Sequence, residues 1–405
     1  MARLSLWIPP FSPDYSGAAA VLFDLKTVTA MHDGSGCTGN YTSYDEPRWY
    51  GSKAGIFCSG LRRIDAILGD DEKLMKKMTA AAADLKPDIL ALIGSPVPMV
   101  IGADLKGIAA ELEERTGLPS FGFDTTGTAY YDQGAYLAGT ALMDRFTKPP
   151  KSGRQTDRHQ VNILGALPMD FGNGENVEAL REILEKNGWE IGLTFAMGYT
   201  LDELANAAEA DVNLAVSRFG YRMAVYMEQK FDIPFVCGFP AGELQEKRLL
   251  AALQKTAEMG TSTVLKDRCP GAAHEKVSEG KKETFLILGE EVMANAIRNV
   301  LEEHFTGCNA VVGCLFGREQ ALARDCDLEL KTERQIKEAM NSDEYKTVIA
   351  DPFLEPLLEE GSKKSFMPLA QYAVSSKLGE QEAAVLAGGR FEQWFKKGKI
   401  RRMKQ

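Results

Sequence analysis

Long apolar runs are missing from this chain of 405 residues. Its apolar segments are short, such as residues 89–93, whereas a membrane-spanning helix needs about 20 consecutive apolar residues. The first residues lack the apolar core of a signal peptide, and their prolines interrupt a helix. The sequence therefore predicts a cytoplasmic protein that has no membrane partner.

An excess of positive charge is also missing. The chain has 47 lysines and arginines against 57 aspartates and glutamates, which gives a net charge of −10. This balance argues against a general nucleic-acid-binding protein, so we expect no nucleic-acid partner. The one basic run, residues 396–405, is interpreted as a solvated helix end rather than a docking patch, because cations favour the C-terminal end of a helix.

Nucleotide-binding and paired-histidine motifs are missing as well. No GxxxxGK[ST] sequence is present, so the sequence shows no phosphate-binding loop of this type. The glycines of residues 165–174 form no GxGxxG and are explained by a tight strand-to-helix turn. The four histidines, at positions 32, 159, 274 and 304, show no i,i+4 pair. His32 precedes Cys37 by five residues, where it would contact a bound group, accept a proton, or occupy a surface loop.

Cysteine occurs in ordinary number, seven in all, and no CxxC pair is present. A disulfide framework is not indicated, which agrees with a reducing compartment. Cys37 lies in a glycine-rich segment (HDGSGCTGNY), Cys58 follows two apolar residues, and Ser95 follows the apolar run 89–93. Thiolates in such loops are the ligands of iron–sulfur clusters, but most free cysteines are small core residues. Spacing alone leaves both interpretations open for Cys37 and Cys58.

The other five cysteines are not assigned to a site. Cys237 ends an apolar run and is expected in the core. Cys308 and Cys314 lie six residues apart on one expected strand, about 20 Å at 3.3 Å per residue, which is too far to share a small cluster. Cys326 is expected in the core or at the surface, and Cys269, in a polar loop, is a candidate exposed thiol.

Alternating short apolar runs and helical segments predict an α/β fold. Buried runs between helices are typical of parallel sheets, and a strand–helix pattern repeats four times after residue 160. Polar segments at 148–159 and 266–282 are interpreted as linkers. They divide the chain into three doubly wound domains, 1–150, 160–265 and 283–405, of which the first carries the candidate cysteines. Three local expectations are an apolar strand or turn within 14–32, one helix over 64–84, and an extended segment over 367–376.

Residues 37–105 resemble the cluster-binding region of the nitrogenase component 1 superfamily. The GC pair at Cys37 matches the family's first cysteine motif, and GDDEKL at 69–74 matches the turn after its second cysteine. IGADL at 101–105 matches the segment after its third cysteine, whose place is taken here by Ser95. The segments VNILG, MEQKFDIPFVCGFPAG and FMPLAQYAVSSKL extend the resemblance over nearly the whole chain. The resemblance implies three Rossmann-like domains.

The same resemblance implies an iron–sulfur cluster with Cys37 and Cys58 as its metal ligands. Two thiolates per subunit suit a [4Fe–4S] cluster shared between two subunits better than the family's eight-iron cluster, which uses a third cysteine. Ser95 is a cofactor-binding candidate as a hydrogen-bond donor or an oxygen ligand, or it is a helix N-cap. The cap and hydrogen-bond roles are favoured over ligation.

No iron–molybdenum cofactor site is recognised. Where the family's catalytic nitrogenase subunit has a cysteine before a helix, this chain has Val-Ser-Arg at 216–218, and no histidine follows His304. Arg218, Tyr221 and Arg222 open that helix, where they would bind an anionic group or form a solvated helix end.

The resemblance implies the catalytic component of a reductase. Such an oxidoreductase takes low-potential electrons from an ATP-dependent iron protein of the nitrogenase-reductase type, through a cluster at a dimer interface, to a substrate between the domains. The dimer is a homodimer, or it is a heterodimer or heterotetramer with a paralogous subunit. An assembly scaffold for a metallocluster and a metal-free α/β binding protein are the alternatives. The sequence identifies neither the substrate nor the proton donors.

Overall fold

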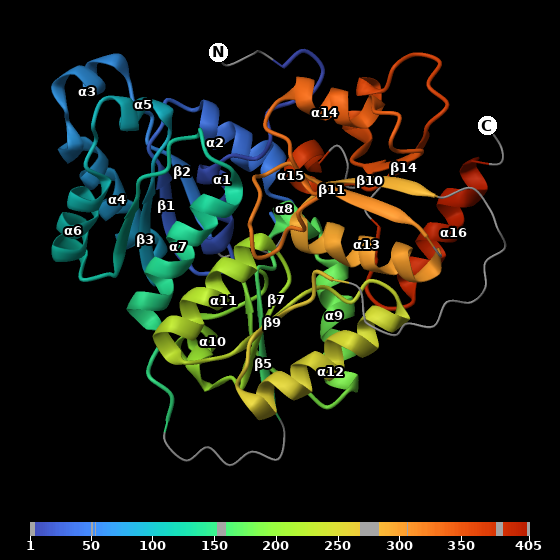
Figure 1. Ribbon diagram of the computed structural model, residues 1–405. Helices are drawn as coiled ribbons and strands as arrows, with labels where there is room; N and C mark the ends of the chain where they lie inside the picture. Colours follow the sequence, from blue (N-terminus) through green and yellow to red (C-terminus); the bar gives the residue numbers. More distant parts are fainter. Residues whose placement is uncertain are drawn as a thin grey trace.

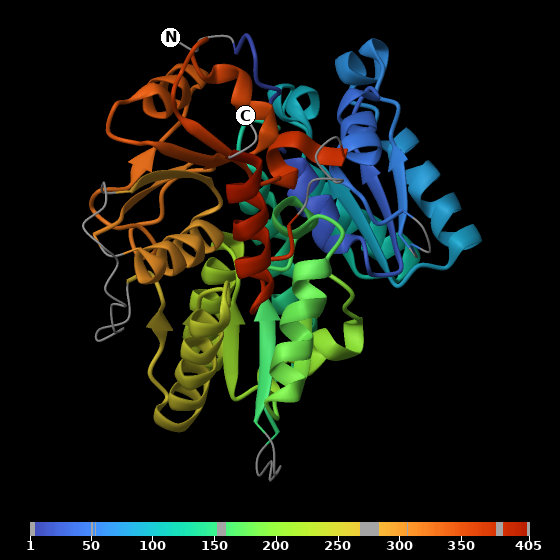
Figure 2. The same cartoon turned by 90° about the vertical axis from the view of Figure 1, so that its right-hand side faces the viewer.

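The structure is a computed structural model that describes residues 5–49, 52, 54–151, 159–267, 283–305, 307–377 and 384–402, with the backbone alone for 399–402. Three α/β units follow one another along the chain, each built on a separate sheet (Figure 1). Every strand pair within these sheets is parallel. Figure 2 shows three lobes that meet near the centre, coloured blue to teal, green to yellow, and orange to red. The predicted fold class is confirmed.

The first sheet has the strand order β2-β1-β3-β4. Its strands are β1 (Thr27–Met31), β2 (Gly55–Cys58), β3 (Ile89–Ile93) and β4 (Ser120–Phe123). Its helices are α1 (Asp14–Leu22), α2 (Gly36–Asn40), the π-helix η1 (Tyr41–Asp45), α3 (Arg63–Leu68), α4 (Asp71–Leu85), α5 (Pro96–Val100), α6 (Leu105–Thr116) and α7 (Tyr131–Phe146). Leu90 and Leu92 share a core with α4 and α6, whereas Ile89 and Ile93 share one with α1 and α7. Both faces of β3 are therefore covered, which explains its unbroken apolar sequence.

The second sheet has the order β6-β5-β7-β8-β9. Its strands are β5 (Gln160–Leu164), β6 (Glu190–Phe195), β7 (Val212–Ala215), β8 (Phe235–Cys237) and β9 (Thr263–Val264). The helices of this unit are α8 (Pro168–Phe171), α9 (Glu175–Lys186), α10 (Leu201–Ala205), the short η2 (Ala207–Glu209), α11 (Arg218–Phe231) and α12 (Glu243–Met259). The four predicted strand–helix repeats are confirmed here.

The third sheet has the order β12-β11-β10-β13-β14. Its strands are β10 (Thr284–Gly289), β11 (Asn309–Cys314), β12 (Leu328–Glu329), β13 (Thr347–Ala350) and β14 (Ser365–Pro368). The helices are α13 (Glu291–His304), α14 (Glu333–Asn341), the 3-10 helix η3 (Pro352–Leu357), α15 (Tyr372–Ser375) and α16 (Arg390–Arg402). Arg390 at the start of α16 pairs with Glu182 of α9 at 3.1 Å, which ties the last helix to the second unit.

The first helix, α1, corrects the expectation of an apolar strand or turn at its position. All nine of its residues are buried, so its sequence lacks the polar face by which an amphipathic helix is recognised. A Cβ at Gly17 would lie 1.8 Å from the Tyr131 carbonyl oxygen, and one at Gly134 would lie 1.8 Å from the Asp14 carbonyl oxygen. The two glycines thus let α1 and α7 pack backbone against backbone.

Two other elements differ from their predicted extents. The single helix expected over 64–84 is divided into α3 and α4 by Gly69, whose φ of +63° ends α3 in a left-handed cap. The extended segment expected over 367–376 ends with β14 at Pro368, and α15 follows as a short helix. Both differences arise at turns, where the backbone conformation of a few residues ends an element although the pattern of apolar side chains continues.

Parts of the predicted linkers, 152–158 and 268–282, lie outside the described residues, and so do Cys269 and the histidine at position 274. The three sheets lie within residues 27–123, 160–264 and 284–368, but the domain limits at 1–150, 160–265 and 283–405 stay a prediction. Among the described helices, none combines the length and the apolar character that crossing a bilayer requires.

Candidate functional site

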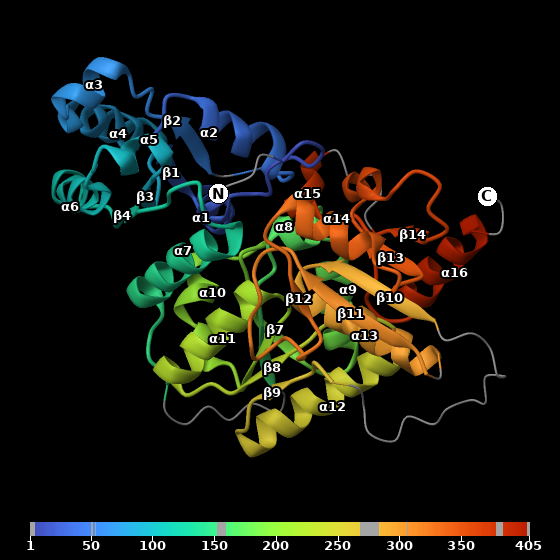
Figure 3. The same cartoon turned by 45° about the horizontal axis from the view of Figure 1, so that its top comes forward.

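The carboxyl ends of three neighbouring strands bring the predicted site residues to one edge of the first sheet. Met31, the last residue of β1, lies opposite Cys58 of β2 and opposite Ile93 of β3. Cys58 therefore ends its strand at the same level at which the chain leaves β3 for Gly94 and Ser95. Figures 1 and 3 show α2, α3 and α5 gathered at this end of the unit. Ligands of α/β sheets usually bind outside the carboxyl ends of the strands.

Cys37 lies on the short helix α2, directly after the turn that leaves β1. Ser35, which precedes this helix, has a φ of +150°, a conformation that is rare in a residue other than glycine and is often found at functional sites. The Cys37 side chain is half-buried. Burial and then the Asp33 carboxylate raise the pKa of its thiol, whereas hydrogen bonds with Tyr15 and Ser95 oppose that rise.

Cys58 is also half-buried and has two contacts with backbone. The Gly60 N–H donates to Cys58 Sγ at 3.3 Å, and the sulfur lies 3.4 Å from the Asp33 carbonyl oxygen. Asp33 also accepts from Thr38, at 2.9 Å from the backbone N–H and 3.1 Å from the hydroxyl. One buried aspartate thus connects the loop of Cys37 to the end of β2, and the sequence alone did not identify it.

Ser95 is fully buried between these loops. It occupies the N-cap position of α5, but its side chain does not cap that helix, because the hydroxyl donates to the His32 carbonyl oxygen at 2.8 Å. The side-chain cap favoured among its predicted roles is therefore wrong. A hydrogen bond from Ser95 to a cluster, and ligation by its oxygen, stay predictions.

His32 is a buried residue rather than a surface loop histidine. Its Nδ1 lies 3.0 Å from Ser59 Oγ, and its side chain is 6% exposed. Burial lowers the pKa of the imidazole below its usual 6.5, against the attraction of Asp71 and Asp33. The ring is therefore neutral at pH 7 and lies beside the sheet edge that holds the two cysteines.

The donor set at this edge fits thiolate ligation. A backbone N–H donates to the sulfur of Cys58, and the polar side chains of Tyr15 and Ser95 oppose the rise in the pKa of the Cys37 thiol. Donors of this kind stabilise cysteine thiolates bound to iron. Within the parts of the chain that the structure describes, no three histidine, cysteine, aspartate or glutamate side chains gather as a metal-binding group. Each chain therefore brings two thiols, Cys37 and Cys58, to this place.

A second polar cluster lies where the three units meet, around the start of α11. Arg218 is buried and reaches Asp132 of α7 at 3.2 Å and Glu291 of α13 at 3.8 Å. Its backbone N–H donates to Glu290 at 2.7 Å. Arg222 pairs with Asp132 at 3.1 Å. The prediction that Arg218 forms part of a solvated helix end is wrong, because its side chain is buried. The acidic groups that it contacts are side chains of the protein itself.

The remaining candidates are placed as follows. Tyr221 packs its ring against Phe235 at 5.8 Å between centroids. Cys237 is in the core, as expected, and Cys314 is buried 3.5 Å from Glu291. Cys308 is half-buried and Cys326 is exposed.

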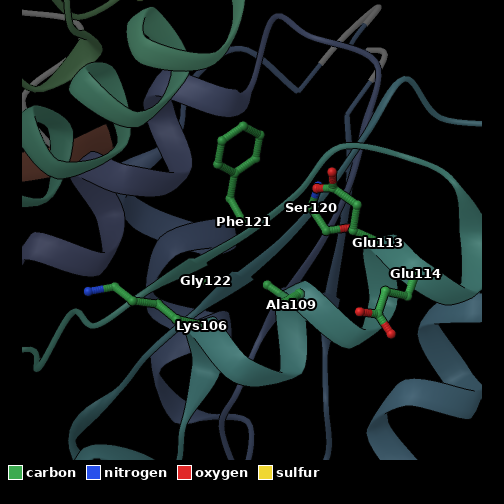
Figure 4. Close-up of a pocket in the computed structure, with 8 residues that line it drawn as sticks. Lys106, Ala109, Glu113, Glu114, Ser120, Phe121 and Gly122 are labelled. Atoms are coloured by element: carbon green, nitrogen blue, oxygen red, sulfur yellow. The ribbon is translucent and has the colours of Figure 1, made fainter.

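Several hollows in the described part of the chain lie away from Cys37 and Cys58. An open one of about 500 Å³ runs along α6 and β4, bordered by Lys106, Glu113 and Phe121 (Figure 4). The Glu113 carboxylate already accepts from the Ser120 N–H and pairs with Arg145, so structural contacts occupy it. Another is a small cavity of about 40 Å³ between the second and third units, with Asp170 and Glu290 in its wall.

Comparison with known proteins identifies the family. Residues 13–352 match the nitrogenase component 1 type oxidoreductases. This chain belongs to that family. It is 22% identical over 341 residues to the nitrogenase molybdenum-iron protein alpha chain of Clostridium pasteurianum, covering 78% of this chain and 60% of that protein. It is 22% identical over 267 residues to the cofactor biosynthesis protein NifE of Methanosarcina barkeri, covering 63% of this chain and 56% of that protein.

A reductase is also among the relatives of this nitrogenase component 1 family member. One component of the light-independent protochlorophyllide reductase of Trichormus variabilis is 24% identical over 198 residues, covering 46% of this chain and 38% of that protein. The chain thus matches only part of the length of these curated relatives. Nitrogenase Cp1 at pH 6.5 has a similar structure, with a TM-score of 0.70 at 14% identity, covering 100% of this chain and 95% of that one. This likeness confirms the fold.

The start of α11 does not fit the thiolate ligation of an iron–molybdenum cofactor. Val216 and Ser217 are fully buried, and the Ser217 hydroxyl donates to the Gly165 carbonyl oxygen at 2.8 Å. Arg218 follows and is held by the carboxylates described above. The polar side chains at this position are therefore a hydroxyl and a guanidinium, and both already bind other groups of the protein.

Proposed function

We propose that this protein is the catalytic component of a nitrogenase-like reductase. In this proposal a dimer of the chain, or a complex with a paralogous subunit, holds a [4Fe–4S] cluster through Cys37 and Cys58. Low-potential electrons come from an ATP-dependent iron protein in the cytoplasm and reduce a substrate that is still to be identified. The observation that carries the proposal is the meeting of two half-buried thiols, with their hydrogen-bond donors, at one sheet edge of a nitrogenase component 1 family member.

Two thiols from one chain supply half of the four that a [4Fe–4S] cluster requires, so a second subunit must supply the others. Bound there, the cluster would supply one-electron transfer at low potential. The task of the chain is to exclude water from the two sulfurs and to direct hydrogen bonds at them. The Gly60 N–H is the donor in place for this at Cys58.

An exposed apolar surface beside the cysteines supports an interface at this end of the molecule. On α3, Ile64, Ile67 and Leu68 are 57%, 67% and 70% exposed, and on α5 Val100 is 86% exposed. Figures 1 and 3 both place α3 and α5 at the end of the first unit that carries the site. Apolar side chains gathered on an exposed face are typical of protein–protein contacts, because their burial on association is favourable.

The cluster ligands are tested by purifying the wild type, Cys37→Ala and Cys58→Ala anaerobically and measuring iron, acid-labile sulfide and the reduced EPR spectrum. We expect both variants to lose the iron and the EPR signal. Cys326→Ala is the matched control, because Cys326 is exposed and lies in the third unit, so this variant should keep both. Iron retained in both site variants would contradict the assignment of the ligands.

The similarity to NifE favours a second candidate function, an assembly scaffold that holds a metallocluster and passes it on. The two functions differ in turnover. With a cognate iron protein, ATP and reductant, a reductase oxidises the iron protein in the presence of substrate over many cycles. A scaffold transfers iron to an acceptor protein once per loading. Multiple turnovers would exclude the scaffold, and a single stoichiometric transfer would exclude the reductase.

A further inference from the structure

The helical segment that carries Cys37 ends at Asp45, a buried residue that the sequence alone did not identify. α2 continues directly into the π-helix η1, so Cys37 and Asp45 lie eight positions apart on one continuous helical segment. Asp45 is 3% exposed. π-Helical turns are rare and frequently occur at functional sites. The contacts of Asp45 therefore decide where this segment lies, and with it the end that bears the thiol.

Four side chains donate hydrogen bonds to the Asp45 carboxyl group. Asn40 of the same helical segment donates to Oδ2 at 2.9 Å, and the Ser16 hydroxyl of α1 donates to Oδ2 at 2.6 Å. The Ser12 hydroxyl, from the residues before α1, donates to Oδ1 at 3.0 Å. The Ser376 hydroxyl, directly after α15 in the third unit, donates to Oδ1 at 3.0 Å. One carboxyl group thus joins this helical segment both to α1 and to the third unit.

α15 connects the third unit to the first at more than one point. The Ser12 N–H donates to the Ala373 carbonyl oxygen of α15 at 2.9 Å, so Ser12 binds α15 through its backbone and Asp45 through its hydroxyl. On the other side, the Ser375 hydroxyl of α15 donates to Asp351 Oδ2 at 2.8 Å. Two consecutive serines therefore bind two buried aspartates, one in the third unit and one in the first.

Ser376 has a backbone conformation that serine rarely adopts. Its φ is +52° and its ψ is −144°, a combination that glycine adopts without strain and that other residues adopt at a free-energy cost. Residues held in such conformations cluster at functional sites, where the surrounding contacts maintain them. The contact in question here is the hydrogen bond to Asp45, which a glycine could not make. The strain at Ser376 is therefore associated with the side chain that joins the two units.

We propose that Ser376 and Asp45 are positioning residues by which the third unit holds the helical segment of Cys37, and thereby keeps the Cys37 sulfur in place to ligate the cluster. Both thiols come from the first unit, but the geometry of one of them then depends on the third unit as well. Groups that orient a metal ligand from behind influence how tightly the metal is held. The inference rests on the proposed function, since the cluster is the one held by Cys37 and Cys58.

Ser376→Gly is the variant that tests this role. It removes the hydroxyl and suits the backbone conformation, so it breaks the link while the free energy of unfolding should stay close to that of the wild type. Ser375→Ala is the matched control. It removes a serine hydroxyl from the neighbouring position, but that hydroxyl binds Asp351 within the third unit, so this variant should be less stable than the wild type. Chemical denaturation measures both.

The first readout is the accessibility of each thiol in the full chain without iron. The protein is treated briefly with N-ethylmaleimide, and the labelling of each cysteine is followed by mass spectrometry. We expect Cys37 to be labelled several-fold faster in Ser376→Gly than in the wild type, and at the wild-type rate in Ser375→Ala. Cys58 is the internal reference and should be labelled equally in all three proteins, because it belongs to β2 and not to the helical segment.

The second readout is the hold of the iron-loaded protein on its metal. We expect Ser376→Gly to release iron to a chelator about tenfold faster than the wild type, since loss of a group that orients a ligand typically weakens metal binding by that factor or more. The EPR spectrum of the reduced cluster should also shift its g values, because the geometry of one thiolate changes. Ser375→Ala should show the wild-type release rate and the wild-type spectrum.

The outcomes separate this inference from the proposed function. A wild type that takes up no iron overturns the proposed function and, with it, the role of Ser376 and Asp45. An iron-loaded Ser376→Gly with wild-type labelling, iron release and EPR spectrum overturns the role of these two residues alone. Equal changes in Ser375→Ala and Ser376→Gly would also overturn it, because any loosening of α15 would then have the effect that we attribute to the contact with Asp45.

Discussion

At the scale of single residues, Cys37, Cys58 and Ser95 could be predicted as one set, and the structure shows why. Cys58 ends a strand of a parallel sheet, Cys37 and Ser95 follow two neighbouring strands, and the ends of such strands meet at a common edge. Asp33 and Tyr15 could not be predicted in the same way. Asp33 lies two residues after β1, a position that could have suggested it, but Tyr15 contacts Asn40 of α2 only through the packing of α1.

Ser95 offers a test of a hydrogen-bonding role against a ligating one. Ser95→Ala removes the donor to the His32 carbonyl oxygen, and we expect it to reduce the free energy of unfolding by about 1–3 kcal/mol, because a buried acceptor loses its partner. Iron content should remain at the wild-type level, as measured after anaerobic purification. A loss of iron comparable with that of Cys37→Ala would instead assign Ser95 as a ligand. Thr140→Ala, a hydroxyl within α7, is the control for stability alone.

At the scale of elements, strands were easier to predict than the helices that touch the site. β3 stands out because it is a buried apolar run, whereas α1 is buried on all sides and its small residues fit several structures equally well. The close contact of α1 with α7 is also what brings Tyr15 under α2. The site therefore depends on glycines that bear no ligand.

Gly17 tests that dependence. Gly17→Ala places a Cβ 1.8 Å from the Tyr131 carbonyl oxygen, so the two helices must separate, and we expect a loss of about 3 kcal/mol or more in the free energy of unfolding. Chemical denaturation measures this directly. Gly39→Ala in α2 is the matched control, because no atom lies within 4 Å of the added Cβ, and it should be neutral or slightly stabilising. Equal stability of the two variants would contradict the close packing of α1 on α7.

At the scale of the whole molecule, the meeting of the three units around Arg218 could not be predicted from sequence. Its partners Asp132 and Glu291 are 86 and 73 positions away, on helices of two other units, and charged residues at such separations show no pattern. The resemblance could indicate three domains, but only the folded chain shows that buried contacts between Arg218 and carboxyl groups join them.

The pH dependence of stability tests this network. Burial raises the pKa of Glu291 from 4.5 to about 8, although Arg218 opposes the rise. The folded protein therefore binds a proton there that the unfolded chain releases above pH 4.5, so this contribution to stability is full below pH 4.5 and is lost as the pH rises through about 8. We expect Glu291→Gln to weaken the fall in stability between pH 5 and pH 8, by up to about 1.4 kcal/mol per pH unit. Glu319→Gln, at a half-exposed partner of Arg222, is the control and should keep the wild-type slope.

The amount of iron and sulfide per dimer, measured on anaerobically purified wild type whose mass is determined by light scattering, tests the central claim most directly. The account predicts about four irons and four sulfides for each pair of cysteine-bearing chains, because two chains supply four thiolates. A monomer that carries a full cluster would contradict the shared site. A protein that takes up no iron after reconstitution under reducing conditions would contradict the redox function, and would leave a nitrogenase-like fold used for binding alone.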